Sequence, residues 1–226
     1  MRLDVLPPPE VDAIYFWTAT VRRPGPSYRD LLGLLSADEQ ARAAGMRNRV
    51  DRVHFVVARA ELRTILASYI GGRPEDVRFR YGQHGKPELA EPQETDLTFS
   101  LSHSGAAALC AVGRRRRVGV DLQQVRTALD WQALARRFLS QADVVAIEAL
   151  PKSRRRRAFF TCWVMKEAVT KACGRGLTLP LDSFSVPEVG HLEGSAWVIQ
   201  PIQVPRQGYV AAIAAEAAAI GAAGGS

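Results

Sequence analysis

The sequence predicts an α+β protein built from two similar lobes. Both halves of the chain mix helix-like with strand-like segments, and both halves end in strands, which favours paired α+β lobes over a doubly wound sheet. A chain of 226 residues can bury a core as one domain or as two half-size lobes. The arginine run Arg114–Arg117 separates the halves, so we expect an N-terminal lobe over residues 1–113 and a C-terminal lobe over 114–220.

The N-terminal half begins with a strand and two helices. The β-branched and aromatic stretch Val11–Val21 indicates a first strand. Ser36 and Glu39, three residues apart, form a capping box that opens a helix. A longer helix is predicted over Val50–Tyr69, because a pair of glycines stops it. Further strands of this half are predicted at Val77–Tyr81, Leu97–Leu101 and Ala106–Val112.

The C-terminal half repeats this mixture. Its helical segments are Asp130–Leu139, Gln141–Leu150 and Ser153–Cys173. Its predicted strands are Val118–Val125, Ser183–Val186, Ala196–Ile199 and Tyr209–Ala215. The last residues are rich in glycine and alanine, so we expect 221–226 to be a flexible tail.

The charge of the chain predicts a polyanionic partner. Its net charge is +7 and its pI is near 9.8, with basic runs at Arg114–Arg117 and Arg154–Arg157. A nucleic acid, an acidic protein, an anionic membrane or a phosphate-rich small molecule would all match this charge. A nucleic-acid-binding module, the main alternative from another class, would need aromatic residues among the basic ones, and the run at 114–117 has none close by.

The N-terminus and the cysteines indicate in which cellular compartment the protein is found. Residues 1–10 lack a basic region followed by an apolar run, and no stretch is long and apolar enough to cross a bilayer. The three cysteines, Cys110, Cys162 and Cys173, form neither a disulfide framework nor a CxxC metal pair. We therefore expect a cytoplasmic protein with reduced thiols and no membrane partner.

The segment Phe159–Gly176 carries the strongest chemical signal. It is apolar nearly all round, yet it contains Lys166, Glu167 and Lys171, and burying unpaired charge is costly. Trp163, Glu167 and Lys171 share one helix face at a spacing of four residues. The pattern fits either an ion pair on an exposed rim or a site where Glu167 holds a metal and the lysines meet phosphate.

Two further segments supply candidate ligands. The strand ending in Ser102 and His103 presents a hydroxyl, an imidazole and backbone N–H groups that suit a phosphate oxygen, although a lone histidine is more often structural. Asp121 interrupts a strand that otherwise looks buried, and it could equally be an ordinary strand-end aspartate. With Glu167 it offers two hard oxygen ligands for Mg²⁺. A glycine-punctuated loop at 81–89 presents Lys86.

Together these segments resemble the Sfp-type 4′-phosphopantetheinyl transferases. The resemblance spans roughly 42–186, and the family fold is a pseudo-dimer of related α+β lobes with coenzyme A between them. The matching residues, in order, are Gly85-Lys86-Pro87, Phe99-Ser-Leu-Ser-His103-Ser, Gly119-Val-Asp121, and Trp163-Val-Met-Lys166-Glu167 with Lys171.

The resemblance implies a role for each matching residue. Asp121 and Glu167 resemble the metal carboxylates, and Glu167 resembles the base that accepts the proton of the carrier serine. Lys171 and His103 resemble residues that neutralise phosphate charge during transfer. Further implied contacts with coenzyme A are Ser102, His103, Lys166 and Lys171 at its phosphates, Lys86 near the nucleotide, and Arg42, Arg47 and His54 at the 3′-phosphate. Phe138 and Leu139 lie where the family meets its carrier protein.

One position departs from the family pattern. The best-known members have a second carboxylate two residues after the aspartate, where this chain has Gln123. A neutral amide oxygen is a weaker ligand for Mg²⁺, and a water molecule could take its place. We nevertheless count Gln123 as a third candidate metal residue. A catalytically degenerate relative that binds carriers without transfer is the alternative that this position raises.

The implied activity is transfer of 4′-phosphopantetheine from coenzyme A to a serine of an apo acyl or peptidyl carrier protein. The expected products are the holo carrier and 3′,5′-ADP, and the expected cofactor is Mg²⁺. We expect a monomer, because a pseudo-dimer already supplies both lobes, and no nucleic-acid partner. Acidic carrier proteins would also account for the basic surface.

Overall fold

The computed structural model describes residues 11–19, 25–90, 96–186, 191–192 and 194–217. Two antiparallel sheets form its centre. In the first sheet the strands lie in the order β1 (Val11–Thr18), β5 (Ala107–Arg114), β4 (Leu97–Ser104). In the second sheet the order is β6 (Val118–Gln124), β9 (Tyr209–Glu216), β8 (Ser195–Ile202), β7 (His191–Leu192). A separate hairpin pairs β2 (Phe79–Tyr81) with β3 (Pro87–Leu89).

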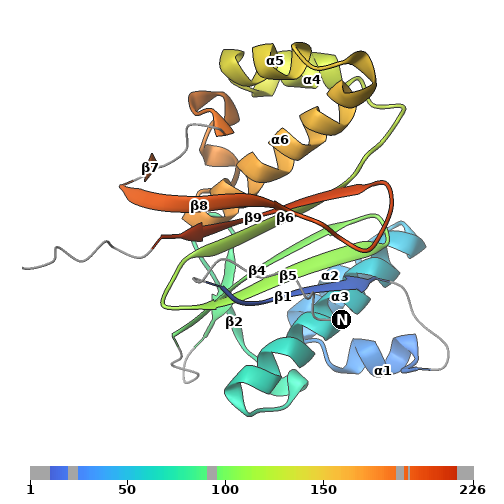
Figure 1. The fold of residues 1–226 in the computed structure, drawn as a ribbon. Helices are drawn as coiled ribbons and strands as arrows, with labels where there is room; N and C mark the ends of the chain where they lie inside the picture. The colour runs from blue at the N-terminus through green and yellow to red at the C-terminus, as the bar shows by residue number, and fades with distance from the viewer. Residues whose placement is uncertain (1–10, 20–24, 91–95, 187–190, 193, 218–226) are drawn as a thin grey trace, which may run out of the picture.

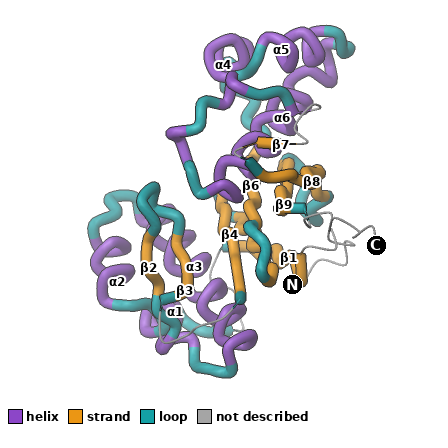
Figure 2. Tube along the Cα trace, turned by 90° about the vertical axis from the view of Figure 1, so that its left-hand side faces the viewer, coloured by secondary structure: helices purple, strands orange, loops and turns teal. Residues whose placement is uncertain are grey.

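Helices flank the sheets on both sides. Figure 1 shows the two sheets stacked between two long helices, and in Figure 2 the remaining helices group with one or the other. The helices of the N-terminal half are α1 (Tyr28–Gly33), α2 (Ala37–Ala44) and α3 (Arg49–Ile70). Those of the C-terminal half are α4 (Trp131–Phe138), α5 (Gln141–Glu148) and α6 (Lys152–Cys173). Short 3₁₀ turns follow at η1 (Pro74–Asp76), η2 (Gly176–Thr178) and η3 (Leu181–Ser183).

An apolar core fills each space between successive layers. One lies between α3 and the first sheet, one between the two sheets, and one between the second sheet and α6. Fully buried residues of these cores are, in the same order, Leu62 and Cys110, Leu109 and Val120, and Val164 and Ala214. Because β-strand side chains alternate between faces, each sheet contributes to two cores at once, and its strands are apolar on both faces.

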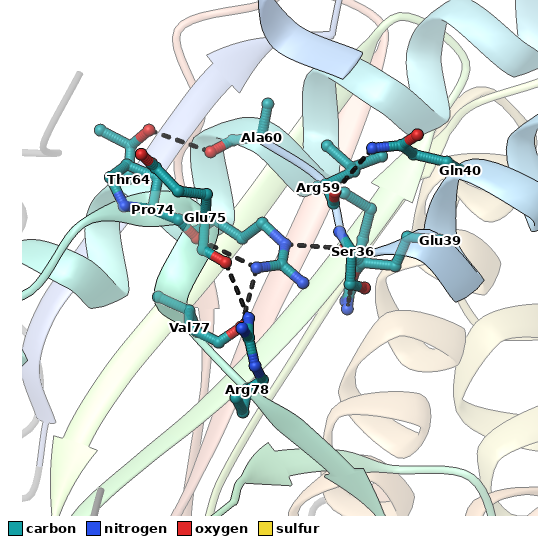
Figure 3. Close-up of polar contacts among 12 residues, drawn as sticks. Ser36, Glu39, Gln40, Arg59, Ala60, Thr64, Pro74, Glu75, Val77 and Arg78 are labelled. Atoms are coloured by element: carbon teal, nitrogen blue, oxygen red, sulfur yellow. Dashed lines mark hydrogen bonds and ion pairs between the residues drawn. The ribbon is translucent and has the colours of Figure 1, made fainter. Parts of the chain in front are cut away.

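A buried ion cluster fixes α2 to α3. Figure 3 shows Glu39 facing Arg59. The other oxygen of Glu39 accepts from Arg63 Nε at 2.7 Å, and Arg63 also donates to the carbonyl of Val77 at 2.8 Å. Burial opposes ionisation of Glu39, but the two arginine charges outweigh it and lower the pKa of the carboxyl. The cluster therefore ties α2, α3 and the start of the β2–β3 hairpin together.

The structure confirms the α+β class and most of the predicted segments. The expected strand at Ser183–Val186 is wrong: η3 ends at Ser183, and Phe184 turns into the C-terminal core. Helix α1 and strand β3 were not predicted. The chain passes from the first sheet to the second between Arg114 and Val118, while the division into two lobes stays a prediction. The tail at 221–226 lies outside the described residues.

Candidate functional site at the junction of the two sheets

The edges of the two sheets meet along β4 and β6. Alternate serines of β4 point toward β6, and each hydroxyl oxygen accepts a hydrogen bond from a backbone N–H of β6. The pairs are Ser100 with Val120 at 3.1 Å, Ser102 with Leu122 at 3.2 Å and Ser104 with Gln124 at 3.0 Å. We call these three contacts the serine ladder. They fix the register of one strand edge against the other at the place where the sequence motifs converge.

Asp121 lies at the centre of this junction. It is 2 % exposed, and its Oδ1 accepts from Ser102 Oγ and from Lys171 Nζ, both at 2.7 Å. Its other oxygen, Oδ2, accepts from the side-chain amide of Gln123 at 3.4 Å. Lys171 also donates to Ser102 Oγ at 3.1 Å, which closes a triangle of polar groups. The buried carboxylate is therefore paired, as a buried charge requires.

Helix α6 approaches β6 closely enough to bring its side chains to Asp121. A Cβ at Gly119 would lie 2.0 Å from the carbonyl oxygen of Ala168 and 2.4 Å from the nitrogen of Ala172. The absence of a side chain at Gly119 therefore allows the helix backbone to lie against the strand. Glu167 and Lys171 stand one turn apart on this helix, so both reach the junction.

Glu167 is the second carboxylate of the site. Burial raises its pKa, the nearby charge of Asp121 raises it further, and Lys171 partly opposes both effects. Among the described residues no group of three or more His, Cys, Asp or Glu side chains is placed to hold a metal ion. Two hard oxygen donors that repel each other nevertheless fit Mg²⁺, which takes one or two protein carboxylates and completes its shell with water and phosphate.

A cationic group stands beside the carboxylates. His103 is exposed on the face of β4 that is turned away from the serine ladder. Partial loss of water around its ring lowers the pKa of His103, and the charges of Lys171, Arg42 and His54 lower it further. Lys171, Arg42 and His54 thus all act electrostatically on His103, and these four residues are the candidate site for an anion. Arg47 is exposed in the connection between α2 and α3.

Lys86 closes a small cavity next to this group. Its ammonium donates to the carbonyls of Val118 at 3.1 Å and Ala172 at 3.4 Å, and burial lowers its pKa to about 8. The hairpin that carries Lys86 is thereby tied to β6 and α6. The cavity holds about 200 Å³, and its walls include His84, Lys86, Pro87, Phe99, Lys171 and Gly174.

Lys166 does not lie at this site. Its ammonium is fully buried on another side of α6, where it pairs with Asp143 at 2.7 Å and donates to the carbonyls of Leu181 and Phe184. Successive helical residues point about 100° apart, so Lys166 and Glu167 cannot face the same site. The expected contact of Lys166 with coenzyme A is therefore corrected to a structural role.

Two other expectations change in the structure. Leu139 is buried in the C-terminal core, so of the two residues expected at a carrier surface only Phe138 is partly exposed. Ser102 is 5 % exposed, and its hydroxyl is bonded to protein groups rather than facing solvent. Gln123 presents its amide N–H to Asp121, while its oxygen accepts from Ser104 at 3.4 Å.

The sequence did not reveal the uncharged residues that position the charged side chains of the site. Ser100 and Ser104 were not singled out, although the alternation of serine with other residues along β4 was visible in the sequence. Gly119 was noted only as part of a motif. A glycine inside an otherwise apolar strand is the signal that could have indicated close backbone packing.

The part of the chain that contains Asp121, Glu167 and Lys171 is similar to known proteins. Residues 117–214 match the model of the 4′-phosphopantetheinyl transferase superfamily. The chain is 38 % identical over 167 residues to the 4′-phosphopantetheinyl transferase HetI of Nostoc sp., covering 74 % of this chain and 70 % of HetI. It is 33 % identical over 175 residues to a putative 4′-phosphopantetheinyl transferase of Synechocystis sp., covering 77 % and 68 %. It is 28 % identical over 156 residues to Sfp of Bacillus subtilis, covering 69 % and 67 %. The chain therefore belongs to the 4′-phosphopantetheinyl transferase superfamily.

Proposed function

We propose that this protein transfers the 4′-phosphopantetheine group of coenzyme A to a serine of an apo carrier protein. The observation that carries the proposal is the convergence of Asp121, Glu167 and Lys171 at the sheet junction, beside the cations around His103. The proposal includes a monomer whose lobes, 1–113 and 114–220, hold coenzyme A between them. No helix of the described part of the chain could span a membrane.

Coenzyme A would be held by the cationic group and the neighbouring cavity. His103 and Lys171 would contact the diphosphate, and Arg42 and His54 the 3′-phosphate. The support for this grouping is that Lys171, Arg42 and His54 all act electrostatically on His103. The cavity beside Lys86 is bounded by Phe99 and Pro87 and has room for a nucleotide base. Arg47 stays a predicted contact of the 3′-phosphate.

Asp121 and Glu167 would hold Mg²⁺, with Gln123 as a neighbour that orients Asp121. The ion would supply neutralisation of phosphate charge during transfer. Lys171 already pairs with Asp121, so its ammonium is held at the junction before substrate binds and would face the reacting phosphate there. Pre-positioned charge of this kind is the main contribution that proteins make to phosphoryl transfer.

In the proposed reaction the carrier serine hydroxyl attacks the β-phosphate of coenzyme A. A new bond forms between the serine oxygen and this phosphorus, and the bond to the bridging oxygen breaks, which releases 3′,5′-ADP. Glu167 accepts the serine proton, directly or through a water molecule. The raised pKa of Glu167 suits this role, since a general base works best when its pKa is close to the working pH.

Intact-protein mass spectrometry tests the activity directly. An apo carrier protein incubated with this protein, coenzyme A and Mg²⁺ should gain the mass of one phosphopantetheine, and excess chelator should prevent the gain. Asp121→Asn, which removes one carboxylate charge from the junction, should show almost none. Absence of any gain with several carriers of the acyl and peptidyl types would contradict the proposed function.

The basic surface predicts salt-dependent encounter with the carrier. Exposed cations gather on α4 and at the start of α6, and the guanidinium groups of Arg155 and Arg156 donate to carbonyl oxygens, so their charge is not cancelled. We expect the KM for an acidic carrier to rise several-fold between about 50 mM and about 500 mM KCl, because salt screens exposed charges. A KM that does not change over this range would contradict steering by charge.

A further inference from the structure

We infer that Ser102 is a positioning residue that orients Asp121 and Lys171, rather than a residue that contacts coenzyme A. The inference rests on the proposed function, since it concerns the same reaction centre. It assigns to the serine ladder a task beyond joining the two sheets.

The hydroxyl of Ser102 has no remaining capacity for a phosphate. A serine hydroxyl has one proton to donate and two lone pairs. Its proton goes to Asp121 Oδ1 at 2.7 Å, and its lone pairs accept from Lys171 Nζ at 3.1 Å and from the N–H of Leu122 at 3.2 Å. The side chain is also almost completely buried, at 5 % exposure. His103, the next residue, points to the opposite face of the strand and remains accessible.

The contacts of Ser102 select one oxygen of Asp121. Oδ1 accepts from both Ser102 and Lys171, whereas the contact of Oδ2 among the described residues is with Gln123, at the longer distance of 3.4 Å. Oδ2 is therefore the oxygen left available for a cation. The backbone bond from Leu122 holds Ser102 itself in place, so the orientation of the carboxylate is set by the register of β4 against β6.

Neighbours of a metal-binding carboxylate contribute strongly to metal affinity. Loss of such an outer contact commonly costs about 10-fold to 100-fold in affinity or activity. Removal of the Ser102 hydroxyl would leave Asp121 held by Lys171 and Gln123 but less firmly oriented, and it would leave Lys171 with one partner fewer. The effect should fall on metal binding and on kcat, and only weakly on the KM values for coenzyme A and carrier.

Thr98 on the same strand provides a matched control. Its hydroxyl donates to the carbonyl of Arg116 in the connection that leads into β6, and this bond involves neither Asp121 nor Lys171. Thr98→Val therefore removes one part-buried hydrogen bond between β4 and the connection to β6, and it keeps the shape of the side chain. Any decrease in activity or Mn²⁺ affinity that comes merely from losing a side-chain hydrogen bond of β4 should appear in Thr98→Val as well as in Ser102→Ala.

The experiment compares the wild type with Ser102→Ala, Ser102→Thr and Thr98→Val. Binding of Mn²⁺ to each protein with coenzyme A is followed by the electron paramagnetic resonance signal of free Mn²⁺, and transfer kinetics are measured with Mg²⁺. Ser102→Ala should bind Mn²⁺ about 10-fold more weakly and lose kcat by a similar factor. Thr98→Val should keep both values within about two-fold, and Ser102→Thr should recover most of each because it retains the hydroxyl.

Three results would overturn the inference. The first is Mn²⁺ affinity and kcat in Ser102→Ala equal to those of Thr98→Val. The second is weaker binding of coenzyme A with unchanged kcat, which would assign Ser102 to phosphate contact. The third is Ser102→Thr no better than Ser102→Ala in Mn²⁺ binding. If Ser102→Ala does not fold, Ser102→Cys keeps the side-chain volume and weakens the hydrogen bonds. Absence of transfer by the wild type would contradict the proposed function alone, because the Mn²⁺ measurement needs no turnover.

Discussion

Glu167→Gln should transfer phosphopantetheine roughly 1,000-fold more slowly than the wild type, because the proposed base is lost and the proposed metal ligand is weakened. Glutamine keeps the size of the side chain but cannot accept the proton of the carrier serine. The measurement is the initial rate of holo-carrier formation at saturating coenzyme A. Near-normal transfer by the purified variant would contradict the proposed mechanism.

The same variant should be at least as stable as the wild type. The folded-state pKa of Glu167 is raised by burial and by Asp121, so its ionised form costs folding free energy at pH values above its unfolded pKa. Glutamine avoids this cost. The Tm of Glu167→Gln should therefore equal or exceed that of the wild type near pH 7 without metal. Any gain should shrink as the pH falls and vanish below the unfolded pKa of 4.5, where the wild-type carboxyl becomes protonated in both states.

Glu75→Gln provides the control for these two measurements. Glu75 forms a surface ion pair with Arg73 at 3.1 Å, far along the chain from the carboxylates of the site. Exposed pairs of this kind contribute at most about 1 kcal/mol. Glu75→Gln should keep the transfer rate, and its Tm should not rise at neutral pH. A fall in Tm for Glu167→Gln at pH 7 would show that the glutamate is structural.

Gly119→Ala should disrupt the site and the fold together. Its new methyl group would lie 2.0 Å from the carbonyl oxygen of Ala168. Neither group can rotate away, because the methyl carbon is bonded to Cα and the oxygen is part of the helix backbone, so the helix and the strand must separate. Overpacking against backbone should cost about 3 kcal/mol or more, which corresponds to a decrease in Tm of roughly 10 °C for a chain of this size. Separation of α6 from β6 also moves Lys171 away from Asp121, so transfer should be lost.

Gly33→Ala is the matched glycine substitution. Gly33 ends α1, and a Cβ there meets no atom within 4 Å. This variant should keep both the Tm and the transfer rate. Thermal unfolding by circular dichroism, with transfer measured on the same samples, separates the two glycines. A stable and active Gly119→Ala protein would show that α6 does not depend on contact with the strand at this position.

Much of the fold was predictable because its signals are local. The capping box of Ser36 and Glu39, the apolar second part of helix α6 and the alternating strand β4 each show their structure within a few residues of sequence. Elements that depend on distant partners were harder to predict. Strand β3 is three residues long and is paired with β2. The segment Ser183–Val186 resembles a strand in sequence because it contains Phe184, but this side chain is apolar because it packs in the C-terminal core.

The candidate site was predictable as a set of charged residues but not as an arrangement. Asp121, Glu167 and Lys171 were identified from the cost of burying charge, and the structure brings Asp121 and Lys171 into contact. The same reasoning placed Lys166 at the site, because sequence alone did not reveal that Asp143 is its partner. The task of Ser102 depends on contacts between β4 and β6, and a tertiary contact between two sheet edges leaves no local pattern.

The serine ladder also bears on how the protein behaves when it is damaged. Strands β4 and β6 are each the last strand on one side of their own sheet. An uncovered strand edge offers unpaired N–H and C=O groups to other chains and is a common origin of aggregation. Here each edge shields the other, with serine hydroxyls capping alternate N–H groups of β6. Separation of the two sheets would expose two unpaired strand edges at once. The same change would disrupt the reaction centre and promote aggregation, so activity and solubility should be lost together.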